Sequence, residues 1–475
     1  MFTARVYARC KGAPHLLSRR AQSTSSSANP TRFGNGALLT GSFAVGCVTY
    51  AAYNLLGSDS KTLPALSTLK SDIPIIDIAG GYPFQFSPPP TPAQVTERLN
   101  QTTWSYPSTG VRGVTRYDGA QLPSNIRCED RFTHGKFPSP WKPGQEWLAW
   151  GVFDGHGGAQ TSEALSHHLL PYVWKHLQGV PEQRVSEAIK QAFIALDDKF
   201  VKTVPETVAS SLPFAEKVSR LAEGTNGSCA ILSLYDPASR TLRVACTGDS
   251  RAVLGRQITT GWETVALSED QNGKSLSEIA RVEALHPGED GVIKDGRVLG
   301  LEPTRAFGDG RWKWSAGFLE DVRRKFNIGR YKAYDEKFKT APYINAEPVV
   351  TTTKLEEGQT AFLIVASDGL WDTMTSEQAV DLVGRWVKWR MGKGCASTES
   401  VGQDFGTFDL GMVPKEGGQL EEKKITVQDD NVAVHLVRNA VGGAHHDMVS
   451  GILAFKPPYS RLVRDDMTVQ VVLFH

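Results

Sequence analysis

The chain has 475 residues, of which 40% are hydrophobic and 22% are charged, and its formal net charge is +1. This is an ordinary globular composition for one large or two medium domains. The near-zero net charge gives no general attraction to nucleic acid, which excludes nucleic acid as an expected partner. The six cysteines show no CxxC pair and no regular spacing, which predicts free thiols in a reducing compartment and no disulfide framework.

The N-terminal part of the chain is predicted to precede the folded domain. Residues 1–33 are rich in arginine and serine and contain no acidic residue, which is typical of a mitochondrial presequence; a basic unstructured tail is the alternative. Residues 34–57 are uncharged and about as long as the ~20 residues of a membrane-spanning helix. They form a candidate inner-membrane anchor, or an apolar segment that processing removes. Residues 58–101 are punctuated by prolines and are predicted to be a linker.

The remaining chain, 102–475, is predicted to form an α+β domain. Short runs rich in β-branched and aromatic residues predict strands at 147–153, 228–235, 241–247, 252–257, 362–366 and 468–474. Apolar residues at helical spacing predict helices at 165–177, 275–285 and 378–389, with Pro171 expected to kink or split the first. Asp236-Pro237 and Gly248-Asp249-Ser250 are interpreted as turns between successive strands. Antiparallel-type strands mixed with helices are typical of the α+β class.

Two segments are interpreted as insertions into this domain, near 310–343 and near 391–428. The first is basic and aromatic, and we hypothesise that it docks a protein substrate; a solvated surface insertion is the alternative. The second is polar and glycine-rich, which indicates a surface excursion. The run 429–431, Asp-Asp-Asn, precedes a helical pattern and is predicted to cap a helix.

Four acidic motifs each place a carboxylate beside an apolar, strand-like run. They are Glu129-Asp130, Asp154-Gly155-His156, Ser367-Asp368-Gly369 with Asp372, and Asp465-Asp466. Burying a carboxylate is costly unless an opposite charge neutralises it, and a divalent cation does so. Magnesium and manganese prefer oxygen ligands, so carboxylates scattered along a chain can hold them. The motifs therefore predict a two-metal site that hydrolyses a phosphate ester.

Asp154 and its neighbours suggest how such a site would work. Asp154 is predicted to bridge two cations because it ends an apolar run, and Gly155 would let the backbone approach them. His156, two residues on, is placed to protonate the leaving oxygen as a general acid. Two interpretations of Asp249 remain: it is a metal ligand, or it caps a turn. The run 299–309, which ends in Phe-Gly-Asp, is hard to explain as plain structure.

These motifs occur together in an order that resembles one known family. From about residue 124 to the C-terminus, the chain resembles the metal-dependent serine/threonine phosphatases of the PPM (type 2C) family. The resemblance implies a β-sandwich of two antiparallel sheets flanked by pairs of helices. It also implies two Mg²⁺ or Mn²⁺ ions at one end, between the sheets, and direct attack by metal-activated water without a phosphoenzyme.

The resemblance implies roles for individual residues. The implied metal ligands are Asp154, which bridges both ions, the Gly155 carbonyl, Glu129, Asp368 and Asp465. A third metal, where members of the family bind one, would use Asp249 and Asp372. Glu129 and Asp130 are implied to hold the water ligands of the metals. Together with Asp154 and His156 they make up the implied catalytic set, while Asp466 takes an asparagine position of the family pattern.

One departure from the family pattern points to a particular branch. Many members carry a phosphate-binding arginine four residues before the glutamate, and here that position is Asn125. The mitochondrial pyruvate dehydrogenase phosphatase branch also has asparagine there, in a pattern that matches residues 124–130. This resemblance implies that Asn125 faces the phosphate and that the substrate is the phosphorylated E1α subunit of the pyruvate dehydrogenase complex. The alternatives are an inactive scaffold with this fold, or a phosphatase for other mitochondrial phosphoproteins.

Overall fold

A computed structural model describes residues 90–326, 338–392, 405, 420–457 and 459–475. All of these belong to one compact unit, Phe86–His475. The predicted presequence, the candidate anchor at 34–57 and most of the predicted linker lie outside the described residues, as does most of the second predicted insertion. Within the described ranges, no helix is long and apolar enough to cross a membrane.

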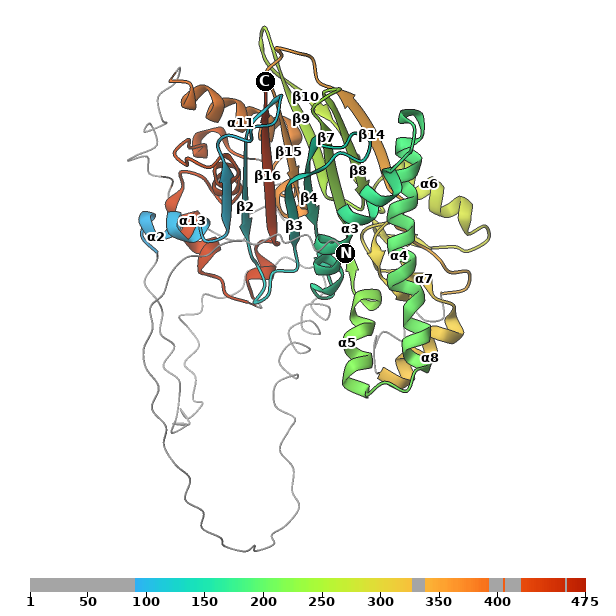
Figure 1. Ribbon diagram of the computed structural model, residues 1–475. Helices are drawn as coiled ribbons and strands as arrows, with labels where there is room; N and C mark the ends of the chain where they lie inside the picture. Colours follow the sequence, from blue (N-terminus) through green and yellow to red (C-terminus); the bar gives the residue numbers. More distant parts are fainter. Residues whose placement is uncertain (1–89, 327–337, 393–404, 406–419, 458) are drawn as a thin grey trace, which may run out of the picture. The chain divides into compact units, whose positions relative to one another are not determined.

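Two antiparallel sheets form the centre of the unit (Figure 1). The first sheet has the strand order β1 (Thr103–Tyr106), β2 (Val114–Leu122), β16 (Met467–Phe474), β15 (Ala361–Ala366), β9 (Arg251–Ile258) and β10 (Gly261–Ala266). The second has the order β14 (Val349–Lys354), β8 (Thr241–Thr247), β7 (Ala230–Asp236), β4 (Glu146–Phe153) and β3 (Arg131–Pro138). The predicted strands are all present, and β1, β2, β3, β10 and β14 add to them.

Alternation of side chains along each strand explains why the two sheets stack. In β15, Leu363 points between the sheets, where it shares one apolar cluster with Trp150 and Ile231 of the second sheet. The next residue, Ile364, belongs to a different cluster on the outer face of the first sheet. A strand that is apolar on both faces must be covered on both sides, because successive side chains point in opposite directions. The chain therefore needs helices outside each sheet.

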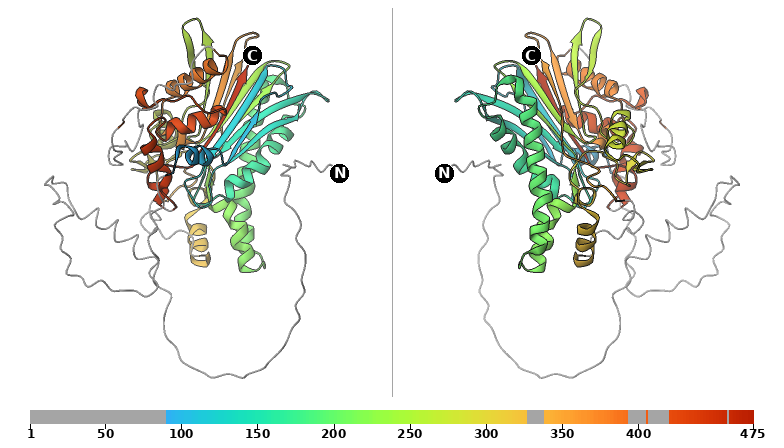
Figure 2. Two further views of the ribbon diagram at one scale, coloured as in Figure 1. Left: turned by 90° about the vertical axis from the view of Figure 1, so that its left-hand side faces the viewer. Right: turned by 90° about the vertical axis from the view of Figure 1, so that its right-hand side faces the viewer.

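Helices cover both outer faces of the sandwich (Figures 1 and 2). The first sheet packs against α2 (Pro92–Leu99), α11 (Ser376–Arg390), α12 (Val432–Ala440) and α13 (His446–Ala454). The second packs against α3 (Gln160–Leu177) and α4 (Val185–Ala209). In Figure 2, α4 extends beyond the sheets, and that part packs against α5 (Phe214–Thr225) and α8 (Ala316–Phe326). The predicted fold class, α+β with a two-sheet sandwich between helices, is confirmed.

Smaller elements connect these layers. A three-stranded sheet joins β13 (Phe307–Gly308), β6 (Gly227–Ser228) and β5 (Gly155–His156), and a two-stranded ribbon joins β11 (Ile293–Lys294) and β12 (Arg297–Val298). Among the described residues, the remaining α-helices are α6 (Leu276–Leu285), α7 (Gly310–Lys313) and α10 (Asp368–Trp371). As predicted for the run 429–431, Asn431 caps α12: its side-chain oxygen accepts hydrogen bonds from the Ala433 and Val434 amides.

The turn predicted at 248–250 does lie between two successive strands, but these strands belong to different sheets and do not form a hairpin. It follows β8 of the second sheet and precedes β9 of the first. The sequence pattern of strand, glycine turn and strand is the same for a hairpin and for a crossover, so it could not distinguish the two. By contrast, Asp236-Pro237 does lie in a hairpin, between β7 and β8.

Two prolines that could have interrupted helices lie within helices of the structure. Helix α3 is not split at Pro171, because Leu169 and Val173 on its apolar face are fully buried against the second sheet and α4. The predicted linker 58–101 ends in helix α2, whose Val95 and Leu99 are buried. Pro92 lies in the first turn of α2, where a proline leaves no hydrogen bond unmade.

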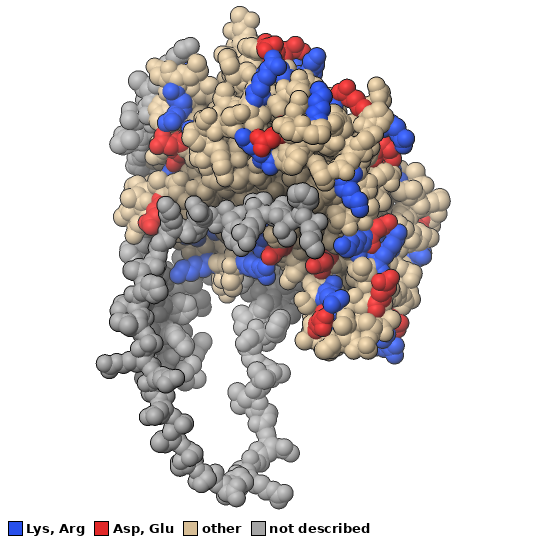
Figure 3. Space-filling view, in the orientation of Figure 1, with Lys and Arg blue, Asp and Glu red and all other residues tan. Residues whose placement is uncertain are grey.

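The described part of the first predicted insertion is packed, and two of its arginines are paired with acidic residues of the same helix. Helix α8 contributes buried Leu319 and Val322 to the cluster around the far end of α4. Its arginines form ion pairs along the helix, Arg323 with Glu320 at 2.5 Å and Arg324 with Asp321 at 3.1 Å. On the face shown in Figure 3, acidic and basic side chains are likewise interspersed. Substrate docking by this segment remains a hypothesis.

Candidate active site

The strand register places the acidic motifs at one end of both sheets. In the second sheet, the last residue of β4 pairs with the first residue of β3, so Asp154 and Asp130 flank the same pair. In the first sheet, the last residue of β15 pairs with the first residue of β9, so Asp368 and Asp249 lie at one end. The start of β16 pairs with the end of β2, which adds Asp465 to that end. Antiparallel pairing therefore gathers residues that are far apart in the chain.

A hydrogen bond between the sheets shows that these two ends meet. Ser367 Oγ, just after β15, donates to Asp130 Oδ2, just before β3, at 2.8 Å. Asp130 is 1% exposed, and within the described part of the chain its Oδ1 has no hydrogen-bond partner. Burial, followed by repulsion from the Asp466 carboxylate, raises the pKa of Asp130 to about 7. A buried carboxylate thus lies between the sheets, and none of the ion pairs found among the described residues involves it.

Three further aspartates share this environment. Burial raises the pKa of Asp154 well above its usual range, and the charges of Asp368, Asp130 and Asp249 add to the effect. Burial followed by repulsion from Asp368 raises the pKa of Asp249 to about 7. Among the described residues, Asp368 Oδ1 is a second buried carboxylate oxygen without a hydrogen-bond partner. Crowded carboxylates with unpartnered oxygens are a donor set that suits a hard divalent cation.

The glycines of the Asp-Gly motifs allow the motifs to approach one another. A methyl group on Gly155 would overlap the Glu129 carbonyl oxygen and the Ser162 hydroxyl. A methyl group on Gly369 would overlap the Asp466 carbonyl oxygen. Any larger residue would therefore push the carboxylate-bearing segments apart. The sequence analysis assigned Gly155 to the close approach of a metal; the structure adds the close approach of backbone.

The two carboxylates of Asp465-Asp466 differ: that of Asp466 is buried and hydrogen-bonded, and that of Asp465 is partly exposed. Asp466 is 2% exposed. It accepts hydrogen bonds from the Ser124 and Glu129 amides at 2.5 and 2.7 Å and from Ser124 Oγ at 2.9 Å. Its oxygens are thus used in holding the Glu129 loop. The side chain of Asp465 keeps 27% exposure and forms an ion pair with Arg461. This arrangement supports Asp465 as the ligand of the pair, which stays a prediction.

His156 is held by a residue that the sequence analysis did not assign. His156 Nε2 lies 2.7 Å from Asp309 Oδ2, and Asp309 is 2% exposed. The small sheet explains the contact, because β5 ends at His156, β13 is followed by Asp309, and β6 lies between them. Burial opposes protonation of His156, but the Asp309 carboxylate outweighs it and raises the pKa of His156. The only signal in the sequence was the unexplained run 299–309.

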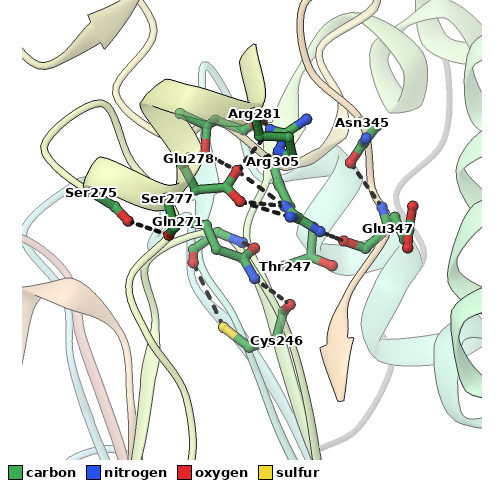
Figure 4. A network of polar contacts seen from close by, with 12 residues as sticks. Cys246, Thr247, Gln271, Ser275, Ser277, Glu278, Arg281, Arg305, Asn345 and Glu347 are labelled. Atoms are coloured by element: carbon green, nitrogen blue, oxygen red, sulfur yellow. Dashed lines mark hydrogen bonds and ion pairs between the residues drawn. The ribbon is translucent and has the colours of Figure 1, made fainter. Parts of the chain in front are cut away.

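A polar network next to Asp249 holds its turn in place (Figure 4). Gln271 donates through Nε2 to the Cys246 carbonyl at 3.1 Å and accepts through Oε1 from the Gly248 amide at 2.9 Å. Close by, Arg305 Nη2 donates to Glu278 Oε1 at 2.7 Å. Three donor side chains, Arg281, Thr304 and Arg305, converge on Glu278 and hold its pKa at about 2 against the opposing effect of burial. Arg305 in the run 299–309 is therefore structural.

Asn125 lies on the Glu129 side of the candidate site. Its Nδ2 donates to Glu129 Oε2 at 3.2 Å. Arg127, the nearest arginine in sequence, instead forms an ion pair with Glu163 of α3 at 2.5 Å. The position where many family members carry a phosphate-binding arginine therefore contributes a neutral amide.

The structure gathers the predicted residues without completing a metal site. Asp372 follows α10 and is exposed, and its amide donates to the Asp368 carbonyl at 2.8 Å. Within the described ranges, no three His, Cys, Asp or Glu side chains converge closely enough to hold a metal ion as they stand. The metal and catalytic roles of Asp154, Glu129, Asp130, Asp368 and Asp465 therefore stay predictions.

Comparison with known proteins decides the family. Residues 117–401 match the family model described as Protein phosphatase 2C. The chain belongs to the protein phosphatase 2C family. A protein phosphatase 2C homolog of Schizosaccharomyces pombe is 38% identical over 401 residues, covering 81% of this chain and 86% of that protein. The chain is accordingly a protein serine/threonine phosphatase.

Two further relatives are named for their substrate. The mitochondrial [pyruvate dehydrogenase [acetyl-transferring]]-phosphatase 1 of Saccharomyces cerevisiae is 35% identical over 403 residues, covering 76% of this chain and 69% of that protein. The bovine (Bos taurus) protein of the same name is 29% identical over 465 residues, covering 81% of this chain and 83% of its own length. The relatives imply that the substrate of this phosphatase is a phosphoprotein.

Proposed function

We propose that this phosphatase depends on Mg²⁺ or Mn²⁺ and acts in the mitochondrion on the phosphorylated E1α subunit of the pyruvate dehydrogenase complex. Metal dependence is supported most strongly by Asp130 Oδ1 and Asp368 Oδ1, two buried carboxylate oxygens without a hydrogen-bond partner among the described residues. They belong to a cluster in which burial raises the pKa of each aspartate, and in which repulsion from neighbouring aspartates adds to the rise for Asp130, Asp154 and Asp249. Divalent cations would remove that repulsion and accept those oxygens as ligands.

The residues that would hold two cations are Asp154, the Gly155 carbonyl, Glu129, Asp368 and Asp465, with Asp249 and Asp372 available to a third. When bound, the cations supply positive charge for the phosphoryl oxygens and lower the pKa of a water molecule. His156 donates a proton to the leaving serine oxygen, because an unprotonated alkoxide leaves slowly. Asp309 keeps His156 in its protonated form and in place. No side chain forms a bond to phosphorus, so no phosphoenzyme accumulates.

The substrate and the compartment are supported by the relatives and by the N-terminal sequence. Two relatives that align over most of this chain are named mitochondrial pyruvate dehydrogenase phosphatases. Asn125 keeps the asparagine of that branch, and residues 1–33 have the composition of a presequence. The uncharged segment 34–57 remains a candidate membrane anchor, which the described residues do not test.

Phosphate release from kinase-phosphorylated pyruvate dehydrogenase complex would test this proposal. The purified protein would be assayed with Mg²⁺, with Mn²⁺ and with a chelator, beside Asp154→Asn. We expect metal-dependent release that the variant loses. Metal-dependent release from generic phosphoserine peptides but not from the complex would move the substrate to another mitochondrial phosphoprotein. No release from either substrate would leave the inactive scaffold as the better account.

A further inference from the structure

On the described loop that carries Asn125, the basic side chains are engaged away from the place a phosphoryl group would take. Asn125 is neutral and is already bonded to Glu129. Arg127 pairs with Glu163, and Arg131 donates to the Cys128 and Asp130 carbonyls, each at 2.7 Å. A dianionic phosphate monoester brought beside these acidic residues would be repelled by them, and only bound metals or another basic side chain would offset that repulsion. Besides any bound metal, therefore, the site calls for a cation from elsewhere in the chain.

Arg461 reaches the site from the segment that leads into β16. It lies on the 3-10 helix η6 (Tyr459–Leu462), and its guanidinium forms an ion pair with Asp465. Burial raises the pKa of both Glu129 and Asp368, and in both cases the charge of Arg461 acts against that rise. One guanidinium thus acts on three residues that are predicted to hold the two metals. Its side chain remains 38% exposed, so it is open to a ligand from solvent.

The backbone on both sides of Arg461 is fastened to the loop that carries Asn125. Ser460 Oγ donates to the Ser124 carbonyl. Arg464 Nη2 donates to the Pro123 carbonyl at 2.9 Å, and Arg464 Nη1 donates to the Ile452 carbonyl at 3.0 Å. Ser460 is fully buried and Arg464 nearly so. Only Arg461 of these three projects an exposed charge, on a turn that is fixed beside the Asn125–Glu129 loop.

We propose that Arg461 binds the phosphoryl group of the substrate and supplies the cation that position 125 lacks. An arginine fork matches two phosphoryl oxygens and donates charge-assisted hydrogen bonds to them. The partner of Arg461 in the structure, Asp465, is itself a predicted metal ligand. Once a metal neutralises Asp465, the guanidinium is free to turn to the phosphate. This inference rests on the proposed metal-dependent function.

A purely structural role for Arg461 makes different predictions. If it served only to neutralise Asp465, its removal would change metal affinity and leave the affinity for phosphate unchanged. If Arg461 binds the phosphoryl group, its removal weakens the binding of inorganic phosphate. Inorganic phosphate is a product of the reaction and retains the phosphoryl oxygens. The loss of charge-assisted hydrogen bonds corresponds to roughly 10- to 100-fold in affinity. Inorganic phosphate is therefore the probe that separates the two roles.

The experiment compares wild type with Arg461→Gln, Arg461→Lys and the double variant Arg461→Gln/Asn125→Arg. For each protein we would measure KM and kcat on a phosphoserine peptide, the inhibition constant of inorganic phosphate, Mn²⁺ affinity by calorimetry, and the melting temperature. Arg127→Gln, at an exposed arginine on the neighbouring loop, is the matched control. We expect Arg461→Gln to raise KM and the phosphate inhibition constant at least about tenfold, with Mn²⁺ affinity kept or increased. Arg461→Lys should restore only part of the lost phosphate affinity, because lysine keeps the positive charge but lacks the two-pronged guanidinium.

Rescue by Asn125→Arg would show that the missing element is a cation at the phosphate. A phosphate inhibition constant that stays at the wild-type value in Arg461→Gln, in a protein of wild-type melting temperature, would overturn the inference while leaving the phosphatase function intact. A wild-type protein without metal-dependent phosphate release would overturn the proposed function, and the role of Arg461 with it.

Discussion

The molecule buries carboxylates in two places, and their surroundings shift the pKa in opposite directions. Around Glu278, Arg305 and Arg281 supply positive charge, and the pKa of Glu278 falls to about 2 despite burial. Around Asp130, a serine hydroxyl donates one hydrogen bond, a second oxygen has no partner among the described residues, and the pKa rises to about 7. The first cluster is electrostatically complete, whereas the second is complete only when something else binds.

This difference distinguishes a structural ion cluster from a functional one. Removing one partner of a buried ion pair destabilises a fold, whereas buried carboxylates with strongly raised pKa values gather at functional sites. The acidic motifs alone could not make that distinction, since both clusters consist of acidic residues beside strands or helices. The distinction depends on which cations the fold brings near, and that is visible only in the structure. Changing one carboxylate in each cluster should therefore have opposite effects on stability.

The largest effect on stability is expected from Glu278→Gln. The substitution leaves Arg305 and Arg281 without their shared carboxylate, and breaking such a buried pair costs about 3–5 kcal/mol. Chemical denaturation of the purified protein would measure the loss of unfolding free energy. Glu283→Gln, at an exposed position of the same helix α6, is the matched control and should change it by less than about 0.5 kcal/mol. A cost for Glu278→Gln as small as the control's would contradict the structural role of the cluster.

The pH dependence of the unfolding free energy of wild type and of Glu278→Gln tests whether the loss of stability is electrostatic. The folded-state pKa of Glu278, about 2, lies below its unfolded value of about 4.3. The stabilisation by the carboxylate is therefore fully present above about pH 4.3 and is lost as the pH falls toward 2. The difference in stability between wild type and Glu278→Gln should shrink over that range, by about 3 kcal/mol. A difference that is constant from pH 6 to pH 3 would exclude an electrostatic origin.

Asp154→Asn is expected to show the opposite pattern of effects. Activity should fall more than about 100-fold, because even the outer partners of metal ligands contribute 10- to 100-fold. The melting temperature of the metal-free protein should rise, since a neutral amide relieves the repulsion from Asp368 and Asp130. Added Mn²⁺ should stabilise wild type by mass action and the variant much less. A metal-free variant that melts below wild type would show that the aspartates are not mutually repulsive.

The sequence was sufficient for the family and for the class of fold, while the roles of the site residues stay predictions. The strand and helix patterns predicted the α+β class, the family resemblance implied the two-sheet sandwich, and the register brings carboxylates of the acidic motifs to one end of both sheets. Local signals failed where a long-range contact decides the outcome. Pro171 remains inside α3 because of burial, and the turn at 248–250 changes sheets because β8 finds its partners elsewhere. The roles of Asp466 and Asp309 were missed for the same reason, since their partners are distant in sequence.

The smallest of the three effects, and the most specific, is expected from Asp309→Asn. The amide can keep a hydrogen bond to His156 Nε2 but removes the negative charge that favours the protonated ring. A general acid contributes about 10²–10⁴-fold in all, and weakening it should cost kcat about 10- to 100-fold on a phosphoserine peptide, with KM nearly unchanged. The matched control is Asp198→Asn, the same change at an aspartate paired with Lys202 on the exposed side of α4.

Comparing substrates with different leaving groups distinguishes a chemical role for Asp309 from a structural one. A serine alkoxide needs a proton as it departs, whereas p-nitrophenolate is stable enough to leave without one. Asp309→Asn should therefore slow the peptide much more than p-nitrophenyl phosphate. Equal losses on the two substrates would mean that Asp309 merely shapes the site, for example by holding the small sheet of β5, β6 and β13. His156→Asn should show the same preference for the better leaving group, because both variants weaken one proton transfer.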